Sequence, residues 1–318
     1  MNKREDYGAP NDAHTRRLTA NDFDPEVLRL FDRYVHGLLD RRGFLDSAAK
    51  FAIAGASATS ILDALSPRFV EAQRVAPTDD RLHIELVDVP SPRGYGNMRG
   101  YLARPNKPAD KLPAVLVAHE NRGLNPHIED IARRIALEGY LAFAPDALFP
   151  LGGYPGDEDK ARELFGKLDQ EKTREDFLAA AHYLEHAAFT NGKLGVIGFC
   201  YGGGIANMLA TKVPTLAAAV SFYGAAPDLA AVPQIKAQLL LNFAENDERI
   251  NAGWPAYEAA LKAAHVKYEA YVYPSTQHGF NNDTTPRFDE AAAKLAWQRS
   301  LDLFARTLHT PGAAPKHA

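Results

Sequence analysis

From residue 81 onward, short apolar runs alternate with longer segments in which apolar residues recur at helical spacing. His83–Val89 and Met98–Arg104 are rich in strand-forming residues and flank a turn-forming segment, which predicts an antiparallel pair of strands. Ala114–Ala118 is apolar without a break, as expected of a strand that is buried on both faces of a sheet.

The same alternation continues to residue 308. Further strands are predicted at Tyr140–Ala144, Leu194–Gly198, Leu216–Phe222, Leu239–Phe243 and Tyr268–Tyr273. Helices are predicted at about 127–138, 157–186 (one long or broken helix), 201–212, 254–265 and 288–308. This order predicts an α/β catalytic domain over residues 81–310, with a mostly parallel eight-stranded sheet covered by helices on both faces. Ligands bind such sheets at the carboxyl ends of the strands, so the loops after residues 118, 144, 198, 243 and 273 should share one edge.

Residues 1–80 have a different pattern and are interpreted as an N-terminal extension. Residues 1–23 are polar and mixed in charge, which is typical of a loose tail. Asp24-Pro25-Glu26 is a helix-start signal, because Asp caps a helix and Pro suits its first turn. The apolar residues that follow at helical spacing predict an amphipathic helix: Val27, Leu28, Phe31, Val35, Leu38 and Leu39.

Two interpretations are open for the next segment. Arg41-Arg42 followed by Phe44-Leu45 and a stretch of small residues resembles a twin-arginine export signal, which Val70-Glu71-Ala72 could end as a cleavage site. The position of the arginines some forty residues into the chain, and charges within the apolar run, favour instead a helix that docks on the main domain or on a partner subunit. The location is therefore open between periplasm and cytoplasm, and residues 24–65 are a candidate oligomer contact. The segment is too short and too polar for a membrane anchor.

Composition narrows the function classes. The 318 residues include 36 Lys and Arg against 40 Asp and Glu, and a net charge of −4 favours neither nucleic acid nor an anionic membrane as partner. A single cysteine excludes an intramolecular disulfide and a zinc cluster of cysteines.

That cysteine lies in the motif with the clearest chemistry. Gly198-Phe199-Cys200-Tyr201-Gly202 joins a predicted buried strand to a predicted helix and has the G-x-S-x-G spacing of a nucleophile elbow, with Cys in place of Ser. The glycines let the backbone make a strained turn next to neighbouring elements. The helix N-terminus then faces the sulfur and favours the thiolate. The alternative is a buried structural cysteine in a glycine-rich turn.

The order of two further residues favours the catalytic interpretation. Asp247 follows the strand at 239–243, and His278 follows the strand at 268–273, so both fall on the edge that carries Cys200. An elbow nucleophile is followed along the chain by its acid and then its base. His278 would pair with the thiolate, and Asp247 would fix the tautomer of the imidazole. A helix cap for Asp247 and a loop position for His278 are the structural alternatives.

Four motifs together resemble the dienelactone hydrolases, also called carboxymethylenebutenolidases: Gly-Phe-Cys-Tyr-Gly-Gly, His-Glu-Asn-Arg-Gly, Asn-Asp and His-Gly-Phe. The resemblance covers about residues 80–308 and implies an α/β-hydrolase fold and hydrolysis of an ester or lactone without a cofactor. By position it implies a triad of Cys200, Asp247 and His278. It also implies that Glu120 contacts and activates the cysteine, and that the backbone N–H groups of Asn121 and Tyr201 form the oxyanion hole.

The chain departs from the family where the anionic substrate is held. The family's two arginines are replaced by the segment Pro145–Pro150 and by Asn282, and Arg122 is the obvious cation nearby. Leu148, Phe149, Leu151 and Tyr154 suggest either a more apolar pocket wall or a surface loop packed on itself. Arg122, Phe149, Tyr154 and Asn282 are therefore the candidate substrate-binding residues, and a broad carboxylesterase or thioesterase acting on neutral substrates is the alternative function.

Three rival interpretations carry less weight. His182-Tyr183-Leu184-Glu185-His186 matches the H-x-x-E-H zinc signature, but no third ligand is evident, and no metal site is expected. A redox-sensing Cys200 would lack a second cysteine to resolve a sulfenic acid. A non-catalytic binding protein is disfavoured because Cys200, Asp247 and His278 follow one another in the order of a catalytic triad.

Overall fold

The computed structural model describes residues 16–52 and 57–309. Its centre is an eight-stranded sheet with the strand order β1-β2-β4-β3-β5-β6-β7-β8. The strands are β1 (Leu82–Ser91), β2 (Gly96–Pro105), β3 (Leu112–Ala118), β4 (Leu141–Pro145), β5 (Thr190–Phe199), β6 (Leu216–Phe222), β7 (Gln238–Asn246) and β8 (Tyr268–Gln277). β2 pairs antiparallel with β1 and β4, and all other pairs are parallel. The predicted antiparallel pair and parallel sheet are confirmed.

Helices cover both faces of this sheet. One face packs against α5 (Pro126–Leu137) and α11 (Glu290–Leu308). The other packs against α6 (Glu158–Phe165), α7 (Gln170–His186), α8 (Tyr201–Lys212) and α10 (Trp254–Ala263). The segment predicted as one long or broken helix is thus two helices. β3, whose residues are all buried, lies between the layers, as its unbroken apolar sequence predicts.

Short elements complete the catalytic part of the chain. α9 (Glu248–Asn251) follows β7 directly, and two 3₁₀ turns, η3 (Phe149–Leu151) and η4 (Leu229–Gln234), lie in loops. The parallel strands end on the same edge of the sheet, so the loops that follow β3, β5, β7 and β8 lie close together.

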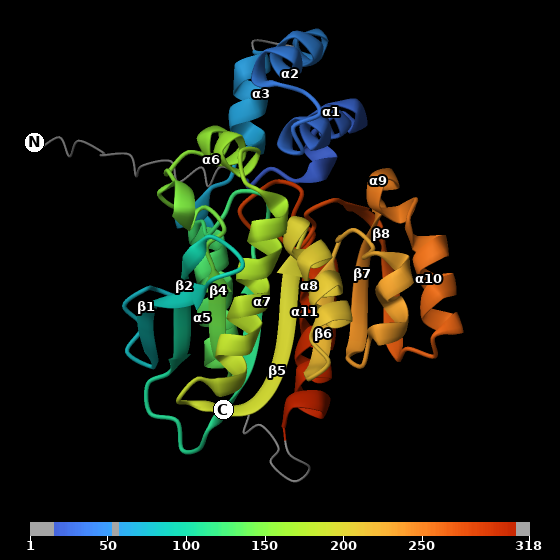
Figure 1. The fold of residues 1–318 in the computed structure, drawn as a ribbon. Helices are drawn as coiled ribbons and strands as arrows, with labels where there is room; N and C mark the ends of the chain where they lie inside the picture. Colours follow the sequence, from blue (N-terminus) through green and yellow to red (C-terminus); the bar gives the residue numbers. More distant parts are fainter. Residues whose placement is uncertain (1–15, 53–56, 310–318) are drawn as a thin grey trace, which may run out of the picture.

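The described part of the N-terminal extension is a small helical layer with its own apolar core. It contains η1 (Ala20–Asp22), α1 (Pro25–Val35), α2 (Arg41–Ala48), η2 (Ala49–Phe51), α3 (Ala58–Leu65) and α4 (Phe69–Ala72). Phe31, Tyr34 and Phe44 pack together with ring centroids 5.5 to 6.3 Å apart. In Figure 1, α1, α2 and α3 lie above the sheet edge toward which β5 points. The extension therefore covers the edge where the predicted site residues gather.

The C-terminus of α1 makes the contact with the catalytic part. The Val35 carbonyl accepts hydrogen bonds from Asn121 Nδ2 (2.9 Å) and Arg122 Nη1 (3.1 Å), and the Tyr34 carbonyl accepts one from Arg162 Nη1 (2.6 Å). The last carbonyls of a helix lack intrahelical partners and carry partial negative charge, so cationic donors suit them. The extension is thus held by polar groups of the sheet edge itself.

One sequence prediction fails at this point. The apolar stripe predicted a helix that continues through Leu38 and Leu39, but α1 ends at Val35 and Leu38 is 62% exposed. Gly37 adopts a left-handed φ of 74°, which ends the helix and turns the chain. The early end places His36 directly over the edge of the sheet.

None of the helices in the described part of the chain combines the length and hydropathy that a membrane span needs. The twin-arginine segment is helix α2 here, and Arg41 Nη1 lies 3.0 Å from Asp159 Oδ2 in the catalytic part. Whether the segment is an export signal or a docked helix stays a prediction, and its residues 53–56 lie outside the described residues.

Candidate active site

Cys200 occupies the sharp turn between β5 and α8. Its backbone angles are φ 55° and ψ −113°, a strained region for a residue with a side chain. A Cβ atom added at Gly198 would lie 1.9 Å from the Gly202 carbonyl oxygen, and one added at Gly202 would lie 2.0 Å from the Ala118 carbonyl oxygen. Both glycines are therefore required by close backbone approach, as the sequence predicted. Gly204 is different, because a Cβ there would meet its nearest atom at 3.8 Å.

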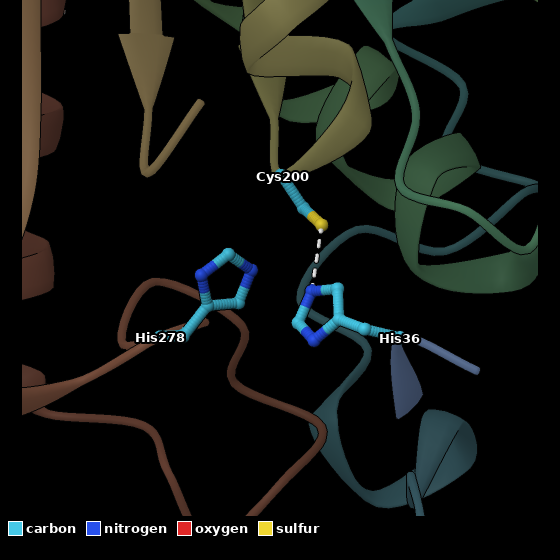
Figure 2. Close-up of side chains that lie close together, drawn as sticks. All are labelled: His36, Cys200 and His278. Atoms are coloured by element: carbon cyan, nitrogen blue, oxygen red, sulfur yellow. Dashed lines mark hydrogen bonds between the residues drawn. The ribbon is translucent and has the colours of Figure 1, made fainter. Parts of the chain in front are cut away.

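His278 and Asp247 form a buried hydrogen-bonded pair next to this turn. Asp247 follows β7 and His278 follows β8, and Nδ1 of His278 lies 2.5 Å from Oδ2 of Asp247. An Nδ1–H donated to the carboxylate leaves Nε2 as the free ring nitrogen. This Nε2 is buried without a hydrogen-bond partner among the described residues, and Figure 2 shows the ring turned toward Cys200. The structure thus brings the three predicted residues together at one edge of the sheet.

The charges of this group favour a thiolate. Burial alone would raise the pKa of the Cys200 thiol, but the positive charge of the nearby His278 imidazole and the hydrogen bond to His36 lower it to about 6. Burial alone would lower the pKa of His278, but the Cys200 thiolate and Asp247 raise it to about 10. Between these values the stable form is an ion pair of thiolate and imidazolium.

A second histidine lies at the sulfur. His36, the residue that follows α1, places Nε2 3.5 Å from Cys200 Sγ, and its ring meets the His278 ring edge to face with centroids 4.7 Å apart (Figure 2). Sequence reasoning missed His36 because it lies 164 residues before the cysteine, in a segment interpreted as an extension. Its only local signal is the helix-ending Gly37 that follows it.

Glu120 lies beside the site but is held by another residue. Its Oε2 accepts a hydrogen bond from Asn282 Nδ2 at 3.0 Å, and both residues line a cavity that includes Cys200. Within the described ranges, the hydrogen bond to Sγ comes from His36 and not from Glu120. Asn121 and Tyr201, the predicted oxyanion donors, lie at the same edge, on the loop after β3 and at the first residue of α8.

The predicted substrate-binding residues have separate placements. Arg122 is buried, and its guanidinium donates to the Val35 carbonyl and to the Asn121 side chain (2.6 Å), so it is engaged in holding the extension. Tyr154 lines the cavity and donates its hydroxyl to Glu158 at 2.9 Å. Phe149 does not line either described cavity at Cys200; the Arg99 guanidinium covers its ring at 4.8 Å.

Two cavities meet at Cys200 and His36. The first, about 360 Å³, lies between the extension and the sheet edge, and the second, about 780 Å³, lies over α8 and α9. Cavities of this size suit a small organic molecule. The first also holds a cation that sequence reasoning missed: Arg287 is buried, and its Nε and Nη1 have no hydrogen-bond partner among the described residues. Asn282, where the resemblance to the family leads one to expect an arginine, lines the same cavity.

The zinc-like motif on α7 is a surface feature. His182 is exposed and lies 3.0 Å from Glu185, and His186 bonds to the His182 carbonyl. Within the described residues, one group of three side chains could in principle bind a metal ion. It consists of His36, Cys200 and His278, whose possible ligand atoms lie within 4.8 Å of one another. The Arg249 guanidinium lies 2.9 Å from His36 Nε2, so a positive charge already faces that nitrogen.

Comparison with known proteins identifies the family of the chain. Residues 98–308 match the family model described as "Dienelactone hydrolase family". The chain belongs to the dienelactone hydrolase family. Within the extension, residues 14–50 match a second family model, described as "YqhI-like".

Two known proteins and one crystal structure illustrate the similarity. A proposed carboxymethylenebutenolidase of Salmonella typhi is 35% identical over 257 residues, which cover 74% of this chain and 93% of that protein. A proposed hydrolase fragment of Escherichia coli K12 is 51% identical over 113 residues, 36% of this chain and 97% of the fragment. The crystal structure of a proposed dienelactone hydrolase from Klebsiella pneumoniae matches with a TM-score of 0.63 at 32% identity, covering 70% of this chain and 99% of that one. The protein is therefore an α/β-hydrolase-fold hydrolase.

Proposed function

We propose that this protein hydrolyses ester or lactone bonds with Cys200 as nucleophile, His278 as base and acid, and Asp247 as the residue that orients His278. The observation that carries the proposal is the pairing of Asp247 with His278 Nδ1 at 2.5 Å beside a cysteine held on a strained strand-to-helix turn. Such strain is retained where the surrounding structure serves a function.

In the acylation step, the Cys200 thiolate attacks the substrate carbonyl carbon and forms a carbon–sulfur bond. The carbonyl oxygen becomes an oxyanion, and its proposed donors are the backbone N–H groups of Tyr201 and Asn121, which would stabilise it by several kcal/mol. The intermediate collapses, the carbon–oxygen bond of the leaving group breaks, and Nε2 of His278 gives its proton to the departing oxygen. The products are a thioester and an alcohol, which in a lactone stays attached to the acyl group.

In the deacylation step, neutral His278 takes a proton from water as the water oxygen attacks the thioester carbon. Collapse of the second tetrahedral intermediate breaks the carbon–sulfur bond and releases a carboxylic acid. Cys200 leaves as the thiolate and meets the imidazolium of His278, so the ion pair is restored. Asp247 stabilises the charged imidazole in both steps.

The surroundings of Cys200 suit a small ester or lactone of low net charge. Arg287 and the carboxylates Glu120 and Glu158 line the same cavity, and Arg122 is engaged with the Val35 carbonyl. Dienelactones, which give the family its name, are one candidate substrate class. Neutral carboxylic esters and thioesters are the alternative, which the engagement of Arg122 and the replacement of the family's arginine by Asn282 favour.

The deciding experiment compares wild type with Cys200→Ala on a short aryl ester, with His182→Ala as control because His182 is exposed on α7. Cys200→Ala should abolish turnover and keep the far-UV circular dichroism of wild type, and Cys200→Ser should be poor because a hydroxyl needs a stronger base. Intact-mass analysis of a rapidly quenched reaction should show one acyl group on wild type. Substantial turnover by Cys200→Ala would refute the proposal. The same proteins, tested on dienelactone and on neutral aryl esters and lactones, would identify the substrate class.

A further inference from the structure

The N-terminal extension delivers an imidazole to the sulfur of the proposed nucleophile. The His36 side chain is 11% exposed, and its Nε2 lies 3.5 Å from Cys200 Sγ. It approaches the sulfur from the side of the extension, whereas His278 approaches from the loop after β8 (Figure 2). Both imidazoles therefore place a ring nitrogen within 4.8 Å of this sulfur atom, and His36 makes the hydrogen bond to it.

His36 is oriented through its Nδ1, which bonds to a backbone carbonyl and lies near a carboxylate. Its Nδ1 lies 2.7 Å from the Asp32 carbonyl oxygen and 3.2 Å from the Asp32 carboxylate Oδ1. An Nδ1–H donated to Asp32 leaves Nε2 as the nitrogen that faces the sulfur, just as Asp247 leaves Nε2 of His278 free. The Asp32 carboxylate is in turn near Arg287, whose Nη1 lies 3.9 Å away. The extension thus supplies an imidazole together with a carboxylate 3.2 Å from its Nδ1.

The charged groups around His36 allow it two protonation states. Asp32 on α1, Cys200 on the elbow, His278 after β8 and Arg249 on α9 all face it. Burial alone would lower the pKa of His36, but hydrogen bonds to Asp32 and Cys200 raise it above its ordinary value. Arg249 donates to Nε2 at 2.9 Å when His36 is neutral, and its exposed side chain can withdraw to water when Nε2 carries a proton.

His36 does not seal the sulfur from substrate. Both cavities that reach Cys200, of about 360 and 780 Å³, are also lined by His36, so space remains on either side of the ring. A residue that only blocked the nucleophile would need no carboxylate behind it. The placement of Asp32 on Nδ1 is what an imidazole needs in order to carry charge.

We propose that His36 is a second catalytic imidazole, supplied by the N-terminal extension, which hydrogen-bonds the Cys200 thiolate in the free enzyme and again when deacylation releases it. This inference rests on the proposed function. In acylation His278 gives its proton to the leaving group and becomes neutral, so it no longer supplies a cation to the sulfur. In acylation, His36 stays protonated and His278 alone gives its proton to the leaving group. In deacylation, the N–H of His36 is a second hydrogen-bond donor to the departing sulfur.

The proposed role of His36 requires that the extension stays on the chain. Cleavage after Ala72, where a small-residue site follows the twin-arginine segment, would remove His36 and Asp32 from the chain. The catalytically complete protein is therefore the one that keeps its extension.

The test uses the full chain and the variants His36→Gln and Asp32→Asn, with His182→Gln as an exposed-histidine control. Two readouts are taken: kcat and KM on an aryl ester that wild type hydrolyses, and the pH dependence of the alkylation rate with iodoacetamide. Cys200 is the only cysteine in the chain, so alkylation reports this thiol alone and needs no turnover. His36→Gln should lower kcat about 10- to 100-fold with a smaller change in KM. It should also raise the alkylation midpoint by about one pH unit. Asp32→Asn, a positioning change, should move both readouts in the same direction by less.

Each other outcome is decisive. Unchanged kcat and an unchanged midpoint in His36→Gln would show that His36 only holds the extension in place, and a higher kcat would show that it obstructs the site. Either result overturns the proposal while the assignment of Cys200 stands. Retained turnover in Cys200→Ala would instead overturn the proposed function, so the two failures are distinguishable.

Discussion

Removing the imidazole of His278 tests the origin of the thiolate. We expect His278→Gln to move the pKa of Cys200 upward from about 6 to its ordinary value near 9.0 or beyond, because the remaining burial favours the neutral thiol. A shift of three units corresponds to about 4 kcal/mol of lost stabilisation of the thiolate. The direction follows from the charges: the thiolate of wild type persists above about pH 6 and is lost as pH falls through that value.

The assay is the alkylation rate measured from pH 4 to 10, and the midpoint is a better readout than the rate at one pH. At pH 7 the thiolate fraction should fall from about 0.9 to about 0.01. The thiolate of the variant is more basic, however, and each one reacts roughly 20-fold faster, so the net rate falls only several-fold. The cavities beside Cys200 give the reagent access in both proteins. A midpoint that stays near 6 in His278→Gln, with the His182→Gln control also unchanged, would refute the ion pair.

Two further predictions concern the triad and the elbow. Asp247→Asn should lower kcat at least about 100-fold with the fold intact, because an amide cannot stabilise the charged imidazole; kcat within twofold of wild type on the same ester would contradict this. Gly204→Ala should raise the unfolding free energy by up to about 1 kcal/mol, since a Cβ has 3.8 Å of room. Gly202→Ala should lower it by about 3 kcal/mol, because its Cβ would meet backbone at 2.0 Å. Urea unfolding measures both glycine variants, and equal effects would contradict the distinction.

The extension docks on the loop that carries a proposed oxyanion donor. Its helix α1 ends on donors that belong to the sheet edge, where the Val35 carbonyl accepts from Asn121 and Arg122. Asn121 is the residue whose backbone N–H is a proposed oxyanion donor. The same short loop therefore both holds the extension and serves the proposed reaction, so docking of α1 and the geometry of the site are coupled.

Much of the catalytic part was predictable because its patterns are local. Buried parallel strands require unbroken apolar runs such as Ala114–Ala118, and a nucleophile turn requires glycines at fixed spacing around Cys200. Strand order along the chain was enough to place Asp247 and His278 near the cysteine, because parallel strands end on a common edge. The resemblance to the family implies the same three residues by position.

The sequence by itself determined the sheet, the elbow and the approach of Asp247 and His278, since each depends on residues close in the chain or on the order of strands. Only the tertiary structure decided that Gly204 has room, that Glu120 is held by Asn282, and that Arg122 is engaged by the end of α1. It alone brought His36 to the sulfur across 164 residues. The physical reason is that no local pattern records which surface a helix terminus will meet. That choice depends on donors such as Asn121 and Arg162, which complement the carbonyls of α1 only once the sheet has assembled its edge.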